Sequence, residues 1–162
     1  MTGYLLDASI ISAFAPDRPA LSSEIADFFL QNTDKLFLSA VTVQEIQKGA
    51  VKLRLDSGNK SKKATALSNW LDSLIEKFAD KILPVDAAVA RVAGVVEATA
   101  TAKGRNPGFA DVLIASTAKA YELVLLTANM KHFEPLISNW EIRSNNYSAF
   151  KCAFYLTRRY AR

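Results

Sequence analysis

Four short runs of apolar residues stand out along the chain, and each is followed by polar or helix-forming residues. Runs of this length that are apolar on both faces are typical of parallel sheets, which helices cover on both sides. We therefore predict strands at residues 4–6, 36–38, 82–85 and 123–126. Pro84 removes a backbone donor from the third run, which favours a position near an edge of the sheet.

Between these runs, apolar residues recur at the spacing of amphipathic helices. The predicted helices cover residues 9–14, 24–30, 39–55, 64–78, 87–103 and 110–120. Strands that alternate with helices imply right-handed crossovers, so the sequence predicts an α/β fold, a three-layer α/β/α sandwich with a central, mainly parallel sheet. We expect one domain over residues 1–142, with a short last strand at 140–142, and an extension of unclear structure over 143–162.

Composition narrows the class of protein. The chain has 162 residues, half of them hydrophobic, which suits one domain with a single core and argues against disorder. Its one cysteine, Cys152, excludes an internal disulfide and fits a reducing compartment. Neither a secretory signal nor an apolar run long enough to span a membrane is visible, so we expect a soluble, cytoplasmic protein.

The net charge is +4, and basic residues gather in two segments. One segment lies between residues 48 and 63, and the other covers residues 151–162. A basic balance favours a phosphate-bearing partner, although charged runs are also typical of solvated helix faces.

Three carboxylates hold corresponding places in the alternation of strands and helices. Asp7 ends the first strand, Glu45 lies in the helix after the second, and Asp111 lies in the first turn of the helix that leads into the fourth. If the strands are parallel and adjacent, all three approach the edge where α/β sheets bind ligands. Like charges this close raise one another's pKa values unless a cation neutralises them. Carboxylate oxygens suit Mg²⁺ or Mn²⁺.

Each acid also has a structural explanation. Asp7 is a suitable cap for the short helix that follows it, and Asp111 gains stabilisation from a helix dipole. Thr42 and Glu45 have the spacing of a capping box, in which Glu45 would only bind the start of its helix. Recurrence at corresponding positions favours one shared site over three separate structural roles.

Four segments resemble motifs of the PIN-domain family, especially the VapC-type toxins of toxin–antitoxin pairs. Residues 4–12 (YLLDASIIS) resemble the family's opening motif "hLLDTNhhS", in which h is hydrophobic. The other three are residues 36–49 (LFLSAVTVQEIQKG), 109–118 (FADVLIASTA) and 125–133 (LLTANMKHF), similar to "hxhSxhThxEhxxG", "DxhIAxxA" and "hhTxNxxDF". The four occur in order, and the resemblance covers roughly residues 3–142.

This resemblance implies a ribonuclease that cleaves RNA with Mg²⁺ or Mn²⁺, forms a homodimer and is silenced by a small antitoxin protein. Its catalytic, metal-binding acids would be Asp7, Glu45 and Asp111. The residues expected to support them are Asn129, Ser9, Thr127 and His132. The basic residues expected to guide the RNA backbone are Lys48, Lys52, Arg54 and Lys62.

Two departures from the family pattern matter most, whereas Ala8 and Ser9 in place of the usual Thr-Asn are a milder change because Ser9 keeps a hydroxyl. His132 replaces the usual fourth acid, and Phe109 stands where an aspartate is often found. Because histidine is a poor Mg²⁺ ligand but binds Mn²⁺, these changes imply reduced activity, a preference for Mn²⁺ or a single metal ion. Otherwise His132 is only a surface loop residue. The departures also motivate an alternative, a PIN module that binds RNA or a partner protein without cleaving; a DNA nuclease is a third possibility.

Overall fold

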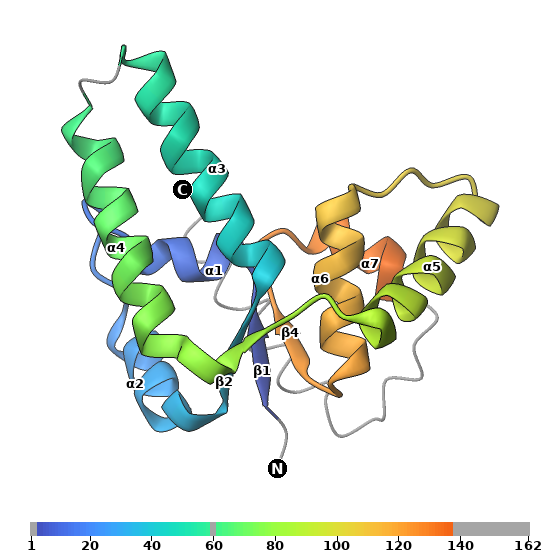
Figure 1. Ribbon diagram of the computed structural model, residues 1–162. Helices are drawn as coiled ribbons and strands as arrows, with labels where there is room; N and C mark the ends of the chain where they lie inside the picture. Colours follow the sequence, from blue (N-terminus) through green and yellow to red (C-terminus); the bar gives the residue numbers. More distant parts are fainter. Residues whose placement is uncertain (1–2, 59–60, 138–162) are drawn as a thin grey trace.

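A parallel sheet lies between two layers of helices (Figure 1). The computed structural model describes residues 3–58 and 61–137. The strands are β1 (Tyr4–Leu6), β2 (Leu36–Ser39), β3 (Ile82–Leu83) and β4 (Val124–Leu126). They lie in the order β3-β2-β1-β4, and each neighbouring pair is parallel. Within the described sheet β3 is therefore an edge strand, which confirms the expectation from Pro84.

The helices lie close to the predicted ranges, except the last, which begins at Met130 within the stretch 127–132 that the sequence indicated as a loop. They are α1 (Ala8–Ile11), α2 (Ser23–Gln31), α3 (Ala40–Asp56), α4 (Lys62–Phe78), α5 (Ala87–Ala102), α6 (Phe109–Ala120) and α7 (Met130–Ile137). Three 3₁₀ turns are η1 (Ser12–Phe14), η2 (Thr33–Lys35) and η3 (Ala79–Lys81). None of the helices in the described ranges combines the length and apolar character that crossing a membrane requires.

Alternate residues of each strand point to opposite faces of the sheet, as strand geometry requires. Leu5 and Leu125 pack in a core with α5, α6 and α7. Leu6, Leu38 and Leu126 pack in a second core with α1, α2, α3 and α4. Because helices cover both faces, the three-layer α/β/α sandwich with a parallel central sheet is confirmed.

Strand register brings the carboxyl ends of three neighbouring strands together. Leu6 of β1 is level with Leu38 of β2 and with Leu126 of β4. The backbone N–H of Asp7 continues the ladder by donating to the carbonyl of Leu126 at 3.0 Å. The residues that follow these strands, Asp7 and Thr127 among them, therefore meet at one end of the sheet.

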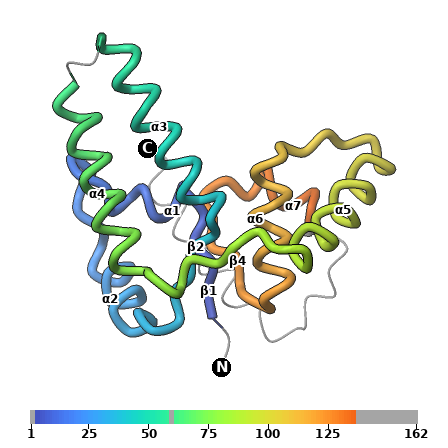
Figure 2. The backbone as a smooth tube through the Cα atoms, viewed as in Figure 1, coloured from blue at the N-terminus to red at the C-terminus, as the bar shows by residue number. Residues whose placement is uncertain are grey.

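Helices α3 and α4 form a pair that projects beyond the sheet, on the opposite side from α5, α6 and α7 (Figure 2). Near its far end, Nη2 of Arg54 donates a hydrogen bond to Oγ of Ser68 at 3.1 Å and links the two helices. The predicted last strand at 140–142 and the extension at 143–162 lie outside the described residues.

Candidate active site

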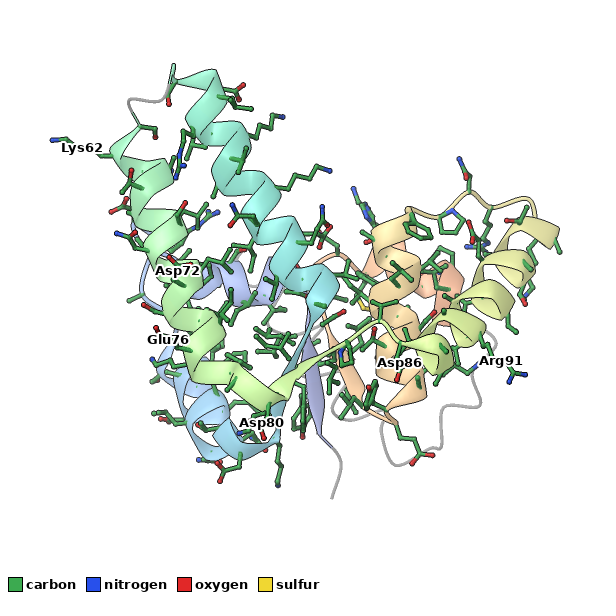
Figure 3. All side chains as sticks on the ribbon, in the orientation of Figure 1. Lys62, Asp72, Glu76, Asp80, Asp86 and Arg91 are labelled. Carbon is green, nitrogen blue, oxygen red and sulfur yellow. The ribbon has the colours of Figure 1, made fainter. Side chains whose placement is uncertain are left out.

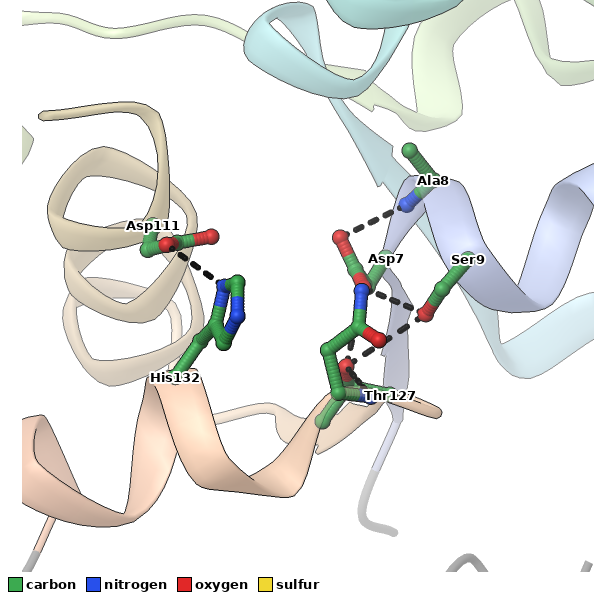
Figure 4. Close-up of polar contacts among 7 residues, drawn as sticks. Asp7, Ala8, Ser9, Asp111, Thr127 and His132 are labelled. Atoms are coloured by element: carbon green, nitrogen blue, oxygen red, sulfur yellow. Dashed lines mark hydrogen bonds and ion pairs between the residues drawn. The ribbon is translucent and has the colours of Figure 1, made fainter. Parts of the chain in front are cut away.

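Asp7 is the most firmly held acid of the three. Its side chain is only 4% exposed. Oδ1 accepts a hydrogen bond from the backbone N–H of Ala8 at 2.7 Å, so Asp7 does cap α1. Oδ2 accepts from the hydroxyl of Ser9 at 2.6 Å and from that of Thr127 at 2.8 Å (Figure 4). Since Oδ1 accepts one bond, it keeps a lone pair for a further partner.

The loop after β4 orients the two hydroxyls. The backbone N–H of Ala128 donates to Oγ of Ser9, and the backbone N–H of Asn129 donates to Oγ1 of Thr127, both at 2.9 Å. Because each oxygen accepts from the backbone, its own hydrogen is left to point at Asp7. The structure thus joins Ser9 and Thr127 to the predicted acid, whereas Asn129 contributes through its backbone.

Glu45 reaches this end of the sheet from the second turn of α3, and the capping-box interpretation is wrong. The helix begins after Ser39, whose Oγ accepts from the N–H of Val41 at 3.2 Å. Thr42 is buried, and its hydroxyl donates to the carbonyl of Leu6 at 3.3 Å. The start of α3 is therefore held by other groups, and Glu45 has no capping role.

Three negative charges interact at this place. Partial burial raises the pKa of Glu45 above 4.5, and the charges of Asp7 and Asp111 raise it further. The charge of Lys48 acts in the opposite direction. These interactions agree with the shared end of the sheet that the alternation of strands and helices predicted, and a single site formed by the three acids stays a prediction.

Asp111 lies in the first turn of α6, where the helix dipole favours a carboxylate. Its Oδ2 lies 3.3 Å from Nδ1 of His132. Figure 4 shows the imidazole on the side of Asp111 that faces Asp7. His132 belongs to α7, so its interpretation as a surface loop residue is wrong, although its side chain is 45% exposed.

The chemistry of this donor set fits a hard divalent cation, because all three acids supply oxygen and their mutual repulsion is what a cation would relieve. In the described part of the chain, no three His, Cys, Asp or Glu side chains already form a metal-binding group. A Mg²⁺-like ion keeps several waters and needs only one or two direct carboxylates. Asp7 is fixed for such a role, and Asp111 is held by His132.

A pocket of about 400 Å³ adjoins Asp111 and was not predicted. It lies between the loop that joins α5 to α6 and the first turns of α7, and its polar lining includes Arg105, Asn106, Lys131 and His132. Sequence carries a partial signal for it, since basic residues stand six positions before Asp111 and next to His132. Only the fold shows that these residues, which are far apart in the sequence, line one pocket.

The basic residues expected to guide RNA are all exposed, but they lie at different places on α3 and α4. Lys48 is near enough to Glu45 to lower its pKa. Arg54 is bonded to Ser68, and Figure 3 shows Lys62 pointing outward from the beginning of α4. Of the four, Lys48 is the one that the geometry connects to the acids; RNA binding by the set stays a prediction.

Comparison with known proteins agrees with this geometry. Ribonuclease VapC2 of Haemophilus influenzae is 28% identical over 149 residues, which cover 91% of this chain and 99% of that protein. Toxin FitB of Neisseria gonorrhoeae is 31% identical, with 80% and 89% covered. The crystal structure of FitAcB from the same organism superposes with a TM-score of 0.68 at 30% identity, over 82% of this chain and 92% of that one.

The family assignment rests on more than these individual relatives. A sequence model described as the PIN domain matches residues 4–134, which include Asp7, Glu45, Asp111 and His132. The match covers well over half of the chain and every element from β1 into α7. The chain therefore belongs to the PIN-domain family.

Proposed function

We propose that this chain is a divalent-metal-dependent endoribonuclease and the toxin of a type II toxin–antitoxin pair. The observation that carries the proposal is that the buried Asp7 carboxylate lies where the carboxyl ends of β1, β2 and β4 meet, with the hydroxyls of Ser9 and Thr127 bonded to it. The charges of Asp7 and Asp111 also raise the pKa of Glu45. Relatives that match over 99% and 89% of their own length are named a ribonuclease and a toxin, which supports the substrate class and the biological role.

The proposed cofactor is Mg²⁺ or Mn²⁺, held by Asp7, Glu45 and Asp111. When bound, such an ion lowers the pKa of a water, orients it and neutralises the scissile phosphate of the RNA. The chain fixes the Asp7 carboxylate through Ala8, Ser9 and Thr127 and buries it, so that little reorganisation is needed. His132 beside Asp111 supports a preference for Mn²⁺, because imidazole suits that ion better than Mg²⁺.

Partners follow from the same proposal. A small antitoxin protein would silence the enzyme. Solved structures that resemble this chain carry the titles FitAcB and VapBC, which supports a protein partner. We further propose a homodimer that acts in the cytoplasm, where its RNA substrate is found. The nuclease domain would comprise residues 1–142, with 143–162 as an extension.

Incubation of the purified protein with total RNA tests the proposal. We expect fragments with Mg²⁺ or Mn²⁺, more of them with Mn²⁺, and intact RNA with a chelator. Single-stranded and double-stranded DNA serve as substrate controls and are expected to stay intact. Intact RNA with either ion would contradict the proposal, and cleavage of DNA in preference to RNA would replace it with a DNA nuclease.

A second candidate is a PIN module that binds RNA without cleaving it. The observation that favours it is the contact between His132 and Asp111, since the imidazole competes with any ion for Oδ2. If this candidate is correct, the protein binds RNA but produces no RNA fragments with either Mg²⁺ or Mn²⁺. An Asp7→Asn change would then alter neither RNA binding nor phenotype.

Because Gly108 has no side chain, the Asp111 carboxylate can occupy the space beside it. A Cβ at this position would lie 2.9 Å from Oδ2 of Asp111 and 3.7 Å from Cγ. The backbone φ of −64° suits any residue, so Gly108→Ala is expected to fold but to displace the carboxylate. We expect cleavage to fall about 10- to 100-fold, as for changes that misplace a metal ligand.

Gly94→Ala on α5 is the matched control for Gly108→Ala, because outside its chain neighbours and its own helix backbone no heavy atom lies within 4 Å of the added Cβ. Cleavage rates and melting temperatures of both variants are to be measured together. Equal rates for the two variants would show that the position of the Asp111 carboxylate does not limit the reaction.

A further inference from the structure

The pocket beside Asp111 has the chemistry of an anion site. Its lining includes two basic residues, Arg105 from the α5–α6 loop and Lys131 from α7, together with Asn106. Within residues 3–58 and 61–137, neither cation forms an ion pair. Two unpaired cations facing one hollow raise the local concentration of anions.

The position of the pocket indicates which anion it receives. Asp111, one of the three proposed metal-binding acids, is the one carboxylate in its lining. An RNA strand whose scissile phosphate lies at the acids must run onward over neighbouring surface, and this pocket is directly adjacent. Its volume of about 400 Å³ is within the range of roughly 300–1,000 Å³ of small-ligand sites, enough for one nucleotide.

We propose that Arg105 and Lys131 bind the backbone phosphate of the nucleotide next to the cleaved bond. The inference rests on the proposed function, because the acids fix where the cleaved bond lies. Arg105 offers a planar fork of donors and Lys131 a point charge, a combination suited to a phosphate approached from two sides. Asn106 would complete the site as a neutral donor.

A binding measurement tests this without relying on cleavage. The protein carries Asp7→Asn, so that RNA stays intact, and the probe is a fluorescein-labelled single-stranded RNA of about ten nucleotides. In this background we expect Arg105→Ala and Lys131→Ala each to raise the dissociation constant about tenfold. The double variant Arg105→Ala, Lys131→Ala should reduce the slope of log affinity against log salt by about 0.7, the value for one lost phosphate contact on a single strand, and each single variant by less.

Arg91→Ala is the matched control. Arg91 is exposed on α5, and Figure 3 shows it pointing away from α6. Arg91→Ala removes one positive charge from the same layer of helices. If RNA binding depended only on the general positive potential, this variant would weaken RNA binding as much as the Arg105 and Lys131 variants do. Arg105→Lys, which keeps the charge, is expected to retain part of the affinity and guards against a folding defect in the alanine variant.

Two results would overturn the inference. In the first, the Arg105 and Lys131 variants bind RNA as well as Arg91→Ala does. In the second, they weaken a complex with a partner protein but leave RNA binding unchanged. Weaker RNA binding in a protein that proves unable to cleave would support the subsite while refuting the proposed nuclease.

Discussion

Replacing Asp7 with asparagine is expected to abolish RNA cleavage while the protein stays folded. Asp7 is the buried carboxylate to which three hydrogen bonds converge, and asparagine has almost the same shape without the charge. Loss of an outer contact at a metal site typically costs about 10- to 100-fold, so loss of a direct ligand is expected to cost more than about 100-fold. The measurement is the initial rate of RNA cleavage with Mn²⁺ present.

Asp72→Asn is the control for this change, because Asp72 is an exposed aspartate on the outer side of α4 (Figure 3). It removes one negative charge without touching the acids, and its cleavage rate is expected to match that of the unmodified protein. Melting curves show whether Asp7→Asn is folded. A folded Asp7→Asn protein that cleaves at the normal rate would remove Asp7 from the reaction.

Glu45→Gln is expected to abolish cleavage as well and, without divalent ions, to stabilise the folded protein. The pKa of Glu45 is raised by burial and by its two acidic neighbours, so its ionisation costs free energy in the folded state. The cost is absent below the ordinary value of 4.5 and complete above the folded-state pKa. Without divalent ions, the variant should therefore melt above the unmodified protein at neutral pH, and this advantage should shrink as the pH falls toward 4.5.

Adding Mn²⁺ is expected to reverse that order. Binding stabilises the folded state by mass action, so the unmodified protein should gain more than Glu45→Gln does. Glu76→Gln, on the exposed outer side of α4 (Figure 3), is the control and should change neither the pH dependence nor the response to the ion. A Glu45→Gln protein that melts below the unmodified one at neutral pH would mean that the carboxylate is held by favourable contacts, not repelled.

The fold was predictable because its determinants are local. Each strand is a short apolar run, and the alternation with helices admits few topologies. The edge position of β3 followed from Pro84 and the start of α5 from Asp86, whose Oδ1 accepts from the N–H of Val89 at 2.9 Å. Both are effects of one residue on its own backbone.

Part of the surroundings of the candidate site was predictable, since Ser9 and Thr127 contact Asp7 as expected, whereas the start of α3 and the helix that carries His132 were not. The capping box failed because Ser39, three residues before Thr42, already caps α3, and the hydroxyl of Thr42 is used by β1 instead. His132 looked like part of a loop because residues 127–132 are mostly small or polar. Burial of Phe133 against α5 and α6 makes this stretch a helix, and such tertiary packing overrides local preference.

Direct measurement of metal binding tests the central claim, that three acids from separate elements form one ion site. Mn²⁺ and then Mg²⁺ are titrated calorimetrically into the metal-free protein and into Asp7→Asn. We expect saturable binding to the unmodified protein, tighter for Mn²⁺, and its loss in Asp7→Asn. Binding of neither ion to the unmodified protein, or equal binding to both proteins, would show that Asp7, Glu45 and Asp111 do not form the site.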